Sequence, residues 1–272
     1  MYNRIVAYGC SITSGFELAD YELMPSLNFV EINKIKAKGV EFWRDKIESK
    51  YSLEYIDSRE HNHAWPQHLA NKLNVDVVNR AYPGSNSESS IYFLEEDISR
   101  GFIKPTDLII VAHTESSRWF YLDKECKKHH CCPGGLPKEW NSQLSHRLRW
   151  PSKSFHKDYV LHVSNDFNDM FRWFKDIKYL EMLSKKHNIL QVFAFTPFLT
   201  QLHNNINKFK EYNLLNAYNS VKEFNSILDN YFSFNDLVNW DDSSQLHTYT
   251  HPKEEYHIEY ANYIYKKIKD RQ

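Results

Sequence analysis

A serine stands just after an apolar run near the start of the chain. Residues 4–9 read Arg-Ile-Val-Ala-Tyr-Gly, which is typical of a strand buried on both faces, and Ser11 follows two positions later. A residue just past the carboxyl end of a parallel strand lies at the edge of the sheet where ligands bind. Gly9 and Gly15 flank Ser11. They allow a tight turn whose backbone N–H groups can face an anion.

Two later segments carry groups that can act together with Ser11. Asn79 ends a second apolar strand, and Gly84 and Asn86 follow it, so both are expected at the same edge of the sheet. His251, followed by proline, precedes the final helix and is expected in the last loop beside that edge. A hydroxyl nucleophile, an imidazole base and N–H donors are the groups that acyl transfer requires. The sequence therefore predicts acyl-transfer chemistry at Ser11.

Alternating strands and helices must position these groups. Strands are expected at residues 4–9, 75–79, 107–113, 189–195 and, more weakly, 237–240. Helices are expected at residues 65–73, 87–99, 166–187, 211–228 and 253–269. This alternation predicts an α/β fold: a three-layer α/β/α sandwich with a flavodoxin-like central parallel sheet of about five strands.

Two long segments, residues 16–63 and 119–165, do not fit the alternation. Each follows the carboxyl end of an expected strand, the first or the third. We interpret both as insertions in a single domain that spans residues 1–272. They either wall or cover a site at that edge of the sheet, or decorate the fold without a role in the site.

In these residues the chain resembles the SGNH hydrolases, also called GDSL-type esterases, and especially bacterial and phage members. The first block of that family reads Gly-Asp-Ser-Ile-Thr-x-Gly, and residues 9–15 match it with Cys10 in place of Asp. Asn79 and Gly84 match the second block, and His251 with its proline matches the end of the last block, Asp-x-x-His-Pro. The resemblance runs from the first strand to the last helix and implies the strand order 2-1-3-4-5.

The resemblance implies a serine esterase that hydrolyses a small ester, with an O-acylated or O-acetylated carbohydrate as the expected substrate. Ser11 would be the nucleophile that forms an acyl-enzyme, and His251 would be its base. The backbone N–H groups of Ser11 and Gly84 would bind the oxyanion. No cofactor and no metal ion are implied.

This chain differs from the family pattern at the third block. The family has Gly-x-Asn-Asp there, and its Asn donates to the oxyanion, whereas residues 112–115 read Ala-His-Thr-Glu. Thr114 therefore takes the position of the Asn, with His113 or Asn86 as substitute donors.

This chain also differs from the family at the acid of the triad. In the family, the acid stands three residues before the histidine, where this chain has Thr248. Asp242, which follows the fifth expected strand, is expected to orient His251; Asp241 and Glu115 are the alternatives. Without any of them, Ser11 and His251 would act as a dyad. These departures also support another hypothesis, a catalytically impaired SGNH-like protein that binds glycans or is a structural part of a virion.

Composition narrows the class of partner. The chain has 272 residues, of which 42% are hydrophobic, and its 34 basic and 35 acidic residues give a net charge of −1. No global field attracts it to nucleic acid or to an anionic membrane. With no secretory signal and no apolar span, a cytoplasmic protein is expected, with virion association possible. The oligomeric state stays open.

Two further groups of residues have other possible uses. Cys126, His129, Cys131 and Cys132 are soft ligands that Zn²⁺ accepts, but their spacing matches no common zinc motif. A metal site there stays an open alternative. His257 lies on the expected last helix and is an alternative base to His251.

Overall fold

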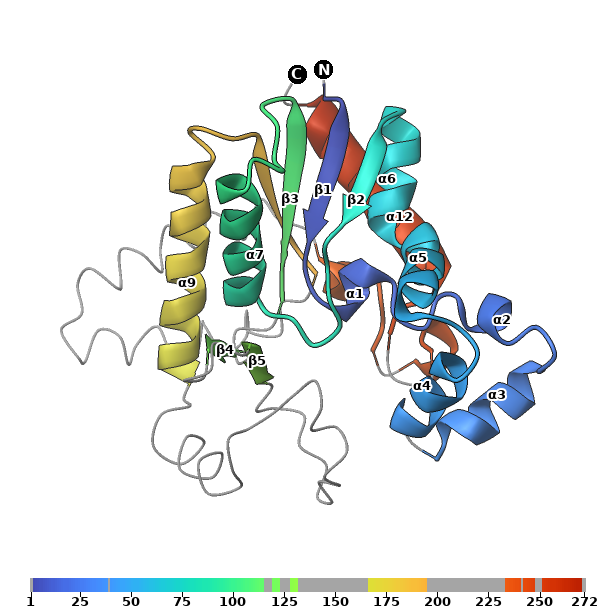
Figure 1. Cartoon of the computed structure of the whole chain (residues 1–272). Coiled ribbons are helices and arrows are strands. Elements are labelled where there is room, and N and C mark those ends of the chain that lie inside the picture. The colour runs from blue at the N-terminus through green and yellow to red at the C-terminus, as the bar shows by residue number, and fades with distance from the viewer. Residues whose placement is uncertain are drawn as a thin grey trace.

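The computed structural model describes residues 2–38, 40–114, 119–122, 128–131, 166–194, 233–240, 242–247 and 251–270. A parallel sheet in the order β2-β1-β3-β6 forms its centre (Figure 1). Its strands are β1 (Arg4–Tyr8), β2 (Asp76–Asn79), β3 (Asp107–His113) and β6 (Ile189–Phe193). The expected parallel sheet and the order of its first four strands are confirmed.

Helices cover both faces of this sheet (Figure 1). The helices are α6 (Trp65–Leu73), α7 (Ser87–Ser99), α9 (Asp166–Leu183) and α12 (Glu254–Lys269). Along β1, Ile5 and Ala7 pack in one apolar cluster with α6 and α12, whereas Val6 and Tyr8 pack in another with α7 and α9. Burial on both faces explains why the strands are nearly continuous apolar runs. The three-layer α/β/α sandwich is confirmed.

Local sequence sets the ends of α6 and α7. Pro66 stands in the first turn of α6, where its missing N–H costs nothing, and Asn74 ends the helix in the left-handed conformation with φ of 53°. Asn86 caps α7, because its side-chain oxygen accepts from the backbone N–H of Ser89 at 2.8 Å. Both helices occupy the residues predicted for them.

The prediction of a fifth strand at residues 237–240 is wrong. The chain instead forms a single parallel bridge between Ser233 and Phe193 and then turns into a 3₁₀-helix, η3 (Phe234–Asp236). The Asp236 carboxylate accepts from the backbone N–H of Ser233 at 2.7 Å and from its hydroxyl at 3.0 Å. This turn buries Phe234 and Val238 in the core. The apolar pattern therefore belongs to a buried turn.

The segment 16–63 folds into short helices beside the carboxyl edge of the sheet (Figure 1). After α1 (Ser11–Ser14) come α2 (Asp20–Leu23), α3 (Phe29–Lys36), α4 (Val40–Glu48) and α5 (Leu53–His63). Their buried apolar residues form a cluster of their own: Ala19, Leu23, Met24, Ile32, Trp43, Ile47 and Ile56. Of the segment 119–165, only β4 (Trp119–Leu122) and β5 (Lys128–Cys131), an antiparallel pair, lie within the described residues. The helix expected at 211–228 lies outside them.

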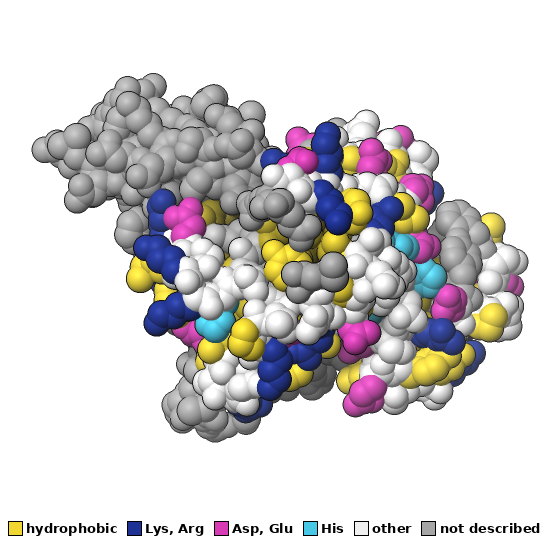
Figure 2. Space-filling model, turned by 90° about the horizontal axis from the view of Figure 1, so that it is seen from above, with side chains coloured by type: hydrophobic (Ala, Val, Ile, Leu, Met, Phe, Trp, Pro, Cys, Tyr) yellow, Lys and Arg dark blue, Asp and Glu magenta, His cyan; other side chains and the backbone are white. Residues whose placement is uncertain are grey.

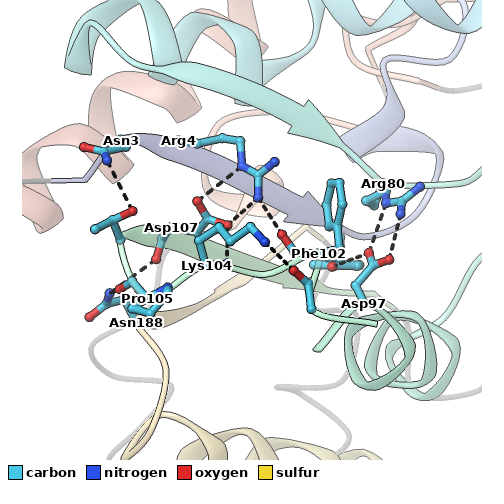
Figure 3. A network of polar contacts seen from close by, with 12 residues as sticks. Asn3, Arg4, Arg80, Asp97, Phe102, Lys104, Pro105, Asp107 and Asn188 are labelled. Atoms are coloured by element: carbon cyan, nitrogen blue, oxygen red, sulfur yellow. Dashed lines mark hydrogen bonds and ion pairs between the residues drawn. The ribbon is translucent and has the colours of Figure 1, made fainter. Parts of the chain in front are cut away.

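Charged pairs join β1, β3 and α7 (Figure 3). Arg4 on β1 forms an ion pair of 2.5 Å with Asp107 on β3. Arg80, which follows β2, pairs with Asp97 on α7 at 2.7 Å, and Asp97 also accepts from the hydroxyl of Tyr8 at 2.7 Å. The guanidinium groups of Arg4 and Arg80 both lie over the ring of Phe102. These contacts fix α7 against the strands that precede the site.

The surface seen from above carries basic and acidic side chains interspersed with one another (Figure 2). This agrees with the net charge of −1. Across the part of the chain that the structure describes, none of the helices is both long and apolar enough to cross a membrane.

Candidate active site

Ser11 begins α1 directly after the carboxyl end of β1. A Cβ at Gly9 would lie 2.4 Å from Oγ1 of Thr13, so only glycine fits between the strand and this helix. Gly15 ends α1 with φ of +81°, and a Cβ there would lie 2.3 Å from the carbonyl oxygen of Glu60. The two glycines of the motif are therefore needed for the turn that presents Ser11.

His251 meets Ser11 across 240 residues of sequence. Its Nε2 lies 2.8 Å from the hydroxyl oxygen of Ser11, and its Nδ1 lies 2.8 Å from Oε2 of Glu17. An ionised carboxylate can only accept, so in the neutral imidazole Nδ1 carries the proton and Nε2 accepts from Ser11. The ring of Phe16 packs against the imidazole at 5.0 Å. Serine, imidazole and carboxylate thus form one continuous chain of hydrogen bonds.

The predicted contact between Asp242 and His251 is wrong, because Asp242 bonds elsewhere. The Asp242 oxygens accept from the backbone N–H of Ser244 at 2.9 Å and from the side chain of Gln245 at 3.1 Å, within their own loop. Hydrogen bonds from the side chain and the backbone of Ser244, followed by the one from Gln245, lower the pKa of Asp242. Nδ1 of His251 forms its hydrogen bond with Glu17 instead. Asp241, Glu115 and Thr248 lie outside the described residues.

Sequence reasoning missed Glu17, which stands six residues after Ser11 in the segment interpreted as an insertion. Its backbone has φ of +74°, a conformation that few residues other than glycine adopt. The backbone N–H of Glu17 donates to Oε1 of Glu60 at 3.3 Å, which helps to hold this conformation. Such strain occurs where the surrounding structure enforces it, as at functional sites.

Glu17 is fully buried yet ionised. Burial alone would raise its pKa, but the hydrogen bond and the charge of His251, together with the Lys36 ammonium, outweigh burial and lower the pKa. Oε1 of Glu17 lies 2.5 Å from Nζ of Lys36. The carboxylate therefore keeps the charge that can stabilise an imidazolium.

Three buried polar atoms that follow the carboxyl ends of β1, β2 and β3 lack hydrogen-bond partners among the described residues. They are Oγ1 of Thr13 on α1, Nδ2 of Asn86 and Oγ1 of Thr114, directly after β3. Gly84, between β2 and Asn86, has φ of +81°. Buried polar atoms are seldom left unpaired, and an oxyanion-binding site is one explanation. The expected donors Thr114, Asn86 and Gly84 all follow the carboxyl ends of β2 and β3, beside the strand that carries Ser11.

His113 and His257, the other histidines considered, are both buried. His113 lies between the hydroxyl of Ser87 at 3.1 Å and Oε1 of Gln191 at 2.7 Å, and burial lowers its pKa to about 4. Nδ1 of His257 accepts from the backbone N–H of Trp65 at 3.2 Å, and burial lowers its pKa well below the usual value. Both rings are neutral parts of the core.

The described residues contain no cluster of three or more potential metal ligands. In the cysteine-rich stretch, His129 and Cys131 belong to strand β5, while Cys126 and Cys132 lie outside the description.

Comparison with known proteins finds a likeness among solved structures. No family model and no curated protein matches the chain. Among solved structures, one from Desulfitobacterium hafniense DCB-2, described by its assignment to the G-D-S-L family of lipolytic proteins, is similar with a TM-score of 0.42 and 11% sequence identity. The alignment covers 97% of this chain and 98% of that one.

Proposed function

We propose that this protein is a serine ester hydrolase of the SGNH type, with Ser11 as nucleophile, His251 as base and Glu17 as acid. The observation that supports this most is the chain of two 2.8 Å hydrogen bonds from Ser11 through His251 to a buried, ionised Glu17. Nucleophile, base and orienting acid within hydrogen-bond reach define the triad arrangement, whatever their order in sequence.

The reaction follows from this arrangement. Oγ of Ser11 attacks the ester carbonyl carbon as Nε2 of His251 takes the hydroxyl proton, and Glu17 stabilises the imidazolium. The tetrahedral intermediate collapses, the imidazolium gives its proton to the departing alkoxide, and an acyl-enzyme remains on Ser11. Water then attacks the acyl carbon with His251 again as base, which releases the carboxylic acid and restores the serine.

The oxyanion is bound by the backbone N–H groups of Ser11 and Gly84, and Thr114 and Asn86 add side-chain donors. Each such donor contributes about 3–4 kcal/mol to the transition state in comparable hydrolases. A small ester, such as an O-acetyl group on a carbohydrate, is the substrate class we infer. This chemistry needs no cofactor or metal ion.

Thr114→Val is expected to lower kcat about 10²–10³-fold with little change in KM, because it removes one oxyanion donor. The hydroxyl has no partner among the described residues, so the methyl group should not lower the melting temperature. Thr114→Ser is the matched control, since it keeps the hydroxyl and should retain most of the activity. Equal kcat values for the Val variant and the wild type would remove Thr114 from the oxyanion site.

The experiment that tests the proposed function is labelling with a fluorophosphonate, which phosphonylates an activated serine and expels fluoride. We expect one adduct by intact mass, located on Ser11 by peptide mapping. Ser11→Ala should give no adduct, and the exposed Ser58, altered to Ala, should label as the wild type does. Absence of labelling together with absence of hydrolysis of 4-nitrophenyl acetate would favour the alternative of an SGNH-like binding or virion protein.

A further inference from the structure

We infer that Lys36 is a positioning residue of the proposed triad: its ammonium group holds the Glu17 carboxylate ionised and oriented toward His251. The inference rests on the proposed function. Lys36 is the last residue of α3, in the segment 16–63, and its side chain is 1% exposed. A lysine this deeply buried is rare unless its charge is matched.

The two oxygens of Glu17 are shared between two cationic or potentially cationic partners. Oε2 contacts Nδ1 of His251 at 2.8 Å, and Oε1 contacts Nζ of Lys36 at 2.5 Å. A carboxylate that is hydrogen bonded at both oxygens cannot rotate away from one partner without losing the other. Lys36 therefore fixes the orientation of the acid as well as its charge.

Lys36 is itself held in place by the helices around it. It forms an ion pair with Asp20 on α2, and its Nζ lies 5.4 Å from the centre of the Trp43 ring on α4. The indole N–H of Trp43 donates to Asp20 at 3.1 Å. The burial of Asp20 raises its pKa to about 6, although Lys36 acts in the opposite direction. Two carboxylates thus share one ammonium group.

After His251, Lys36 is the partner that most lowers the pKa of Glu17, and other charged groups also surround the carboxylate. Glu60 on α5 accepts from the backbone N–H of Glu17, and burial raises the pKa of Glu60 to about 7 despite its contact with Arg44 at 2.9 Å. His247, in the loop before His251, also interacts electrostatically with both Glu17 and Lys36, and burial lowers its pKa to about 4. At neutral pH His247 is therefore uncharged.

The loss of the Lys36 charge is expected to shift the pH dependence in the same direction whether Glu17 or His251 takes the proton. Protonation of Glu17 and protonation of His251 both add positive charge close to Lys36, so the ammonium disfavours both. Removal of the ammonium takes away one of the charges that lower the pKa of Glu17, so the pKa of Glu17 rises. Catalysis needs Glu17 charged and His251 neutral. Loss of Lys36 therefore moves the acidic limb of kcat/KM to higher pH.

The test is the pH profile of kcat/KM for 4-nitrophenyl acetate with Lys36→Met. We expect the acidic limb to move upward by about one to three pH units, with activity recovering above the new limb. Lys36→Arg keeps a charge and should keep the limb near that of the wild type. Lys34→Met, on an exposed position of the same helix, is the matched control and should leave the limb unchanged.

A loss of activity that is uniform across pH, with the limb in place, would show that Lys36 is merely structural and would overturn the inference. If Lys36→Met does not fold by circular dichroism, Asp20→Asn decides. It removes the Asp20 charge that competes with Glu17 for the ammonium, so the limb should move to lower pH, and an unchanged or higher limb contradicts the inference. Failure of the proposed function is distinguishable from failure of this inference, because the wild type would then neither label nor hydrolyse the ester, or hydrolysis would survive in Ser11→Ala.

Discussion

Glu17→Gln is expected to lower kcat for ester hydrolysis about 10⁴-fold, as the loss of the acid does in a serine protease triad. The amide is similar in size to the carboxylate, but it carries no charge to stabilise the imidazolium that forms on His251. It can also donate to Nδ1, which favours the wrong tautomer of the imidazole. The measurement is steady-state hydrolysis of 4-nitrophenyl acetate, with the fluorophosphonate labelling rate as a second readout.

Asp242→Asn is the control for that result. Asp242 contacts Ser244 and Gln245 at the surface, so its charge should have no effect on kcat. If Asp242→Asn were as damaging as Glu17→Gln, the acid would have been assigned to the wrong residue. If both variants retained full kcat, Ser11 and His251 would act as a dyad without an acid.

Ser11→Ala and His251→Ala are each expected to lower kcat about 10⁶-fold, and the double variant is expected to lose no more than either one alone. The two side chains act as a unit, because the hydroxyl becomes a strong nucleophile only when Nε2 can take its proton. Non-additivity therefore reports the 2.8 Å contact between them. Single variants that multiply in the double variant would mean that the residues act in separate steps.

His257→Gln is the control that separates the loss of kcat in His251→Ala from damage to the fold. His257 is also buried, but its Nδ1 accepts from the backbone of Trp65. We expect this variant to lower the melting temperature and to retain a measurable kcat at low temperature. A loss as large as that of His251→Ala in a folded His257→Gln protein would make His257 the base.

The sheet and two of the three proposed triad residues could be predicted because each leaves a local pattern. Apolar runs mark strands that are covered on both faces, and the glycines around Ser11 mark a turn that no other residue fits. His251 could be placed because it follows the last irregular stretch and precedes a well-patterned helix. In each case the information lies within a few residues of the feature.

Glu17 could not be predicted, because the role proposed for it as the acid depends on its surroundings. Its position depends on a left-handed backbone, on Glu60 accepting its N–H and on Lys36 from α3. None of these is visible in the spacing from Ser11. The fifth strand failed for a related reason: burial of Val238 has the same apolar signature in a turn as in a strand, and the side chain of Asp236 decided between them.

Because the proposed acid lies in segment 16–63, the proposed triad residues are distributed unevenly along the chain. The N-terminal quarter carries the proposed nucleophile, the proposed acid and the lysine in contact with that acid, whereas the C-terminal end contributes the imidazole. In the arrangement implied by the family, acid and base share one loop and are inherited together. Here they can diverge independently, so a homologue that lost segment 16–63 would keep Ser11 and His251 but would have to recruit a new acid.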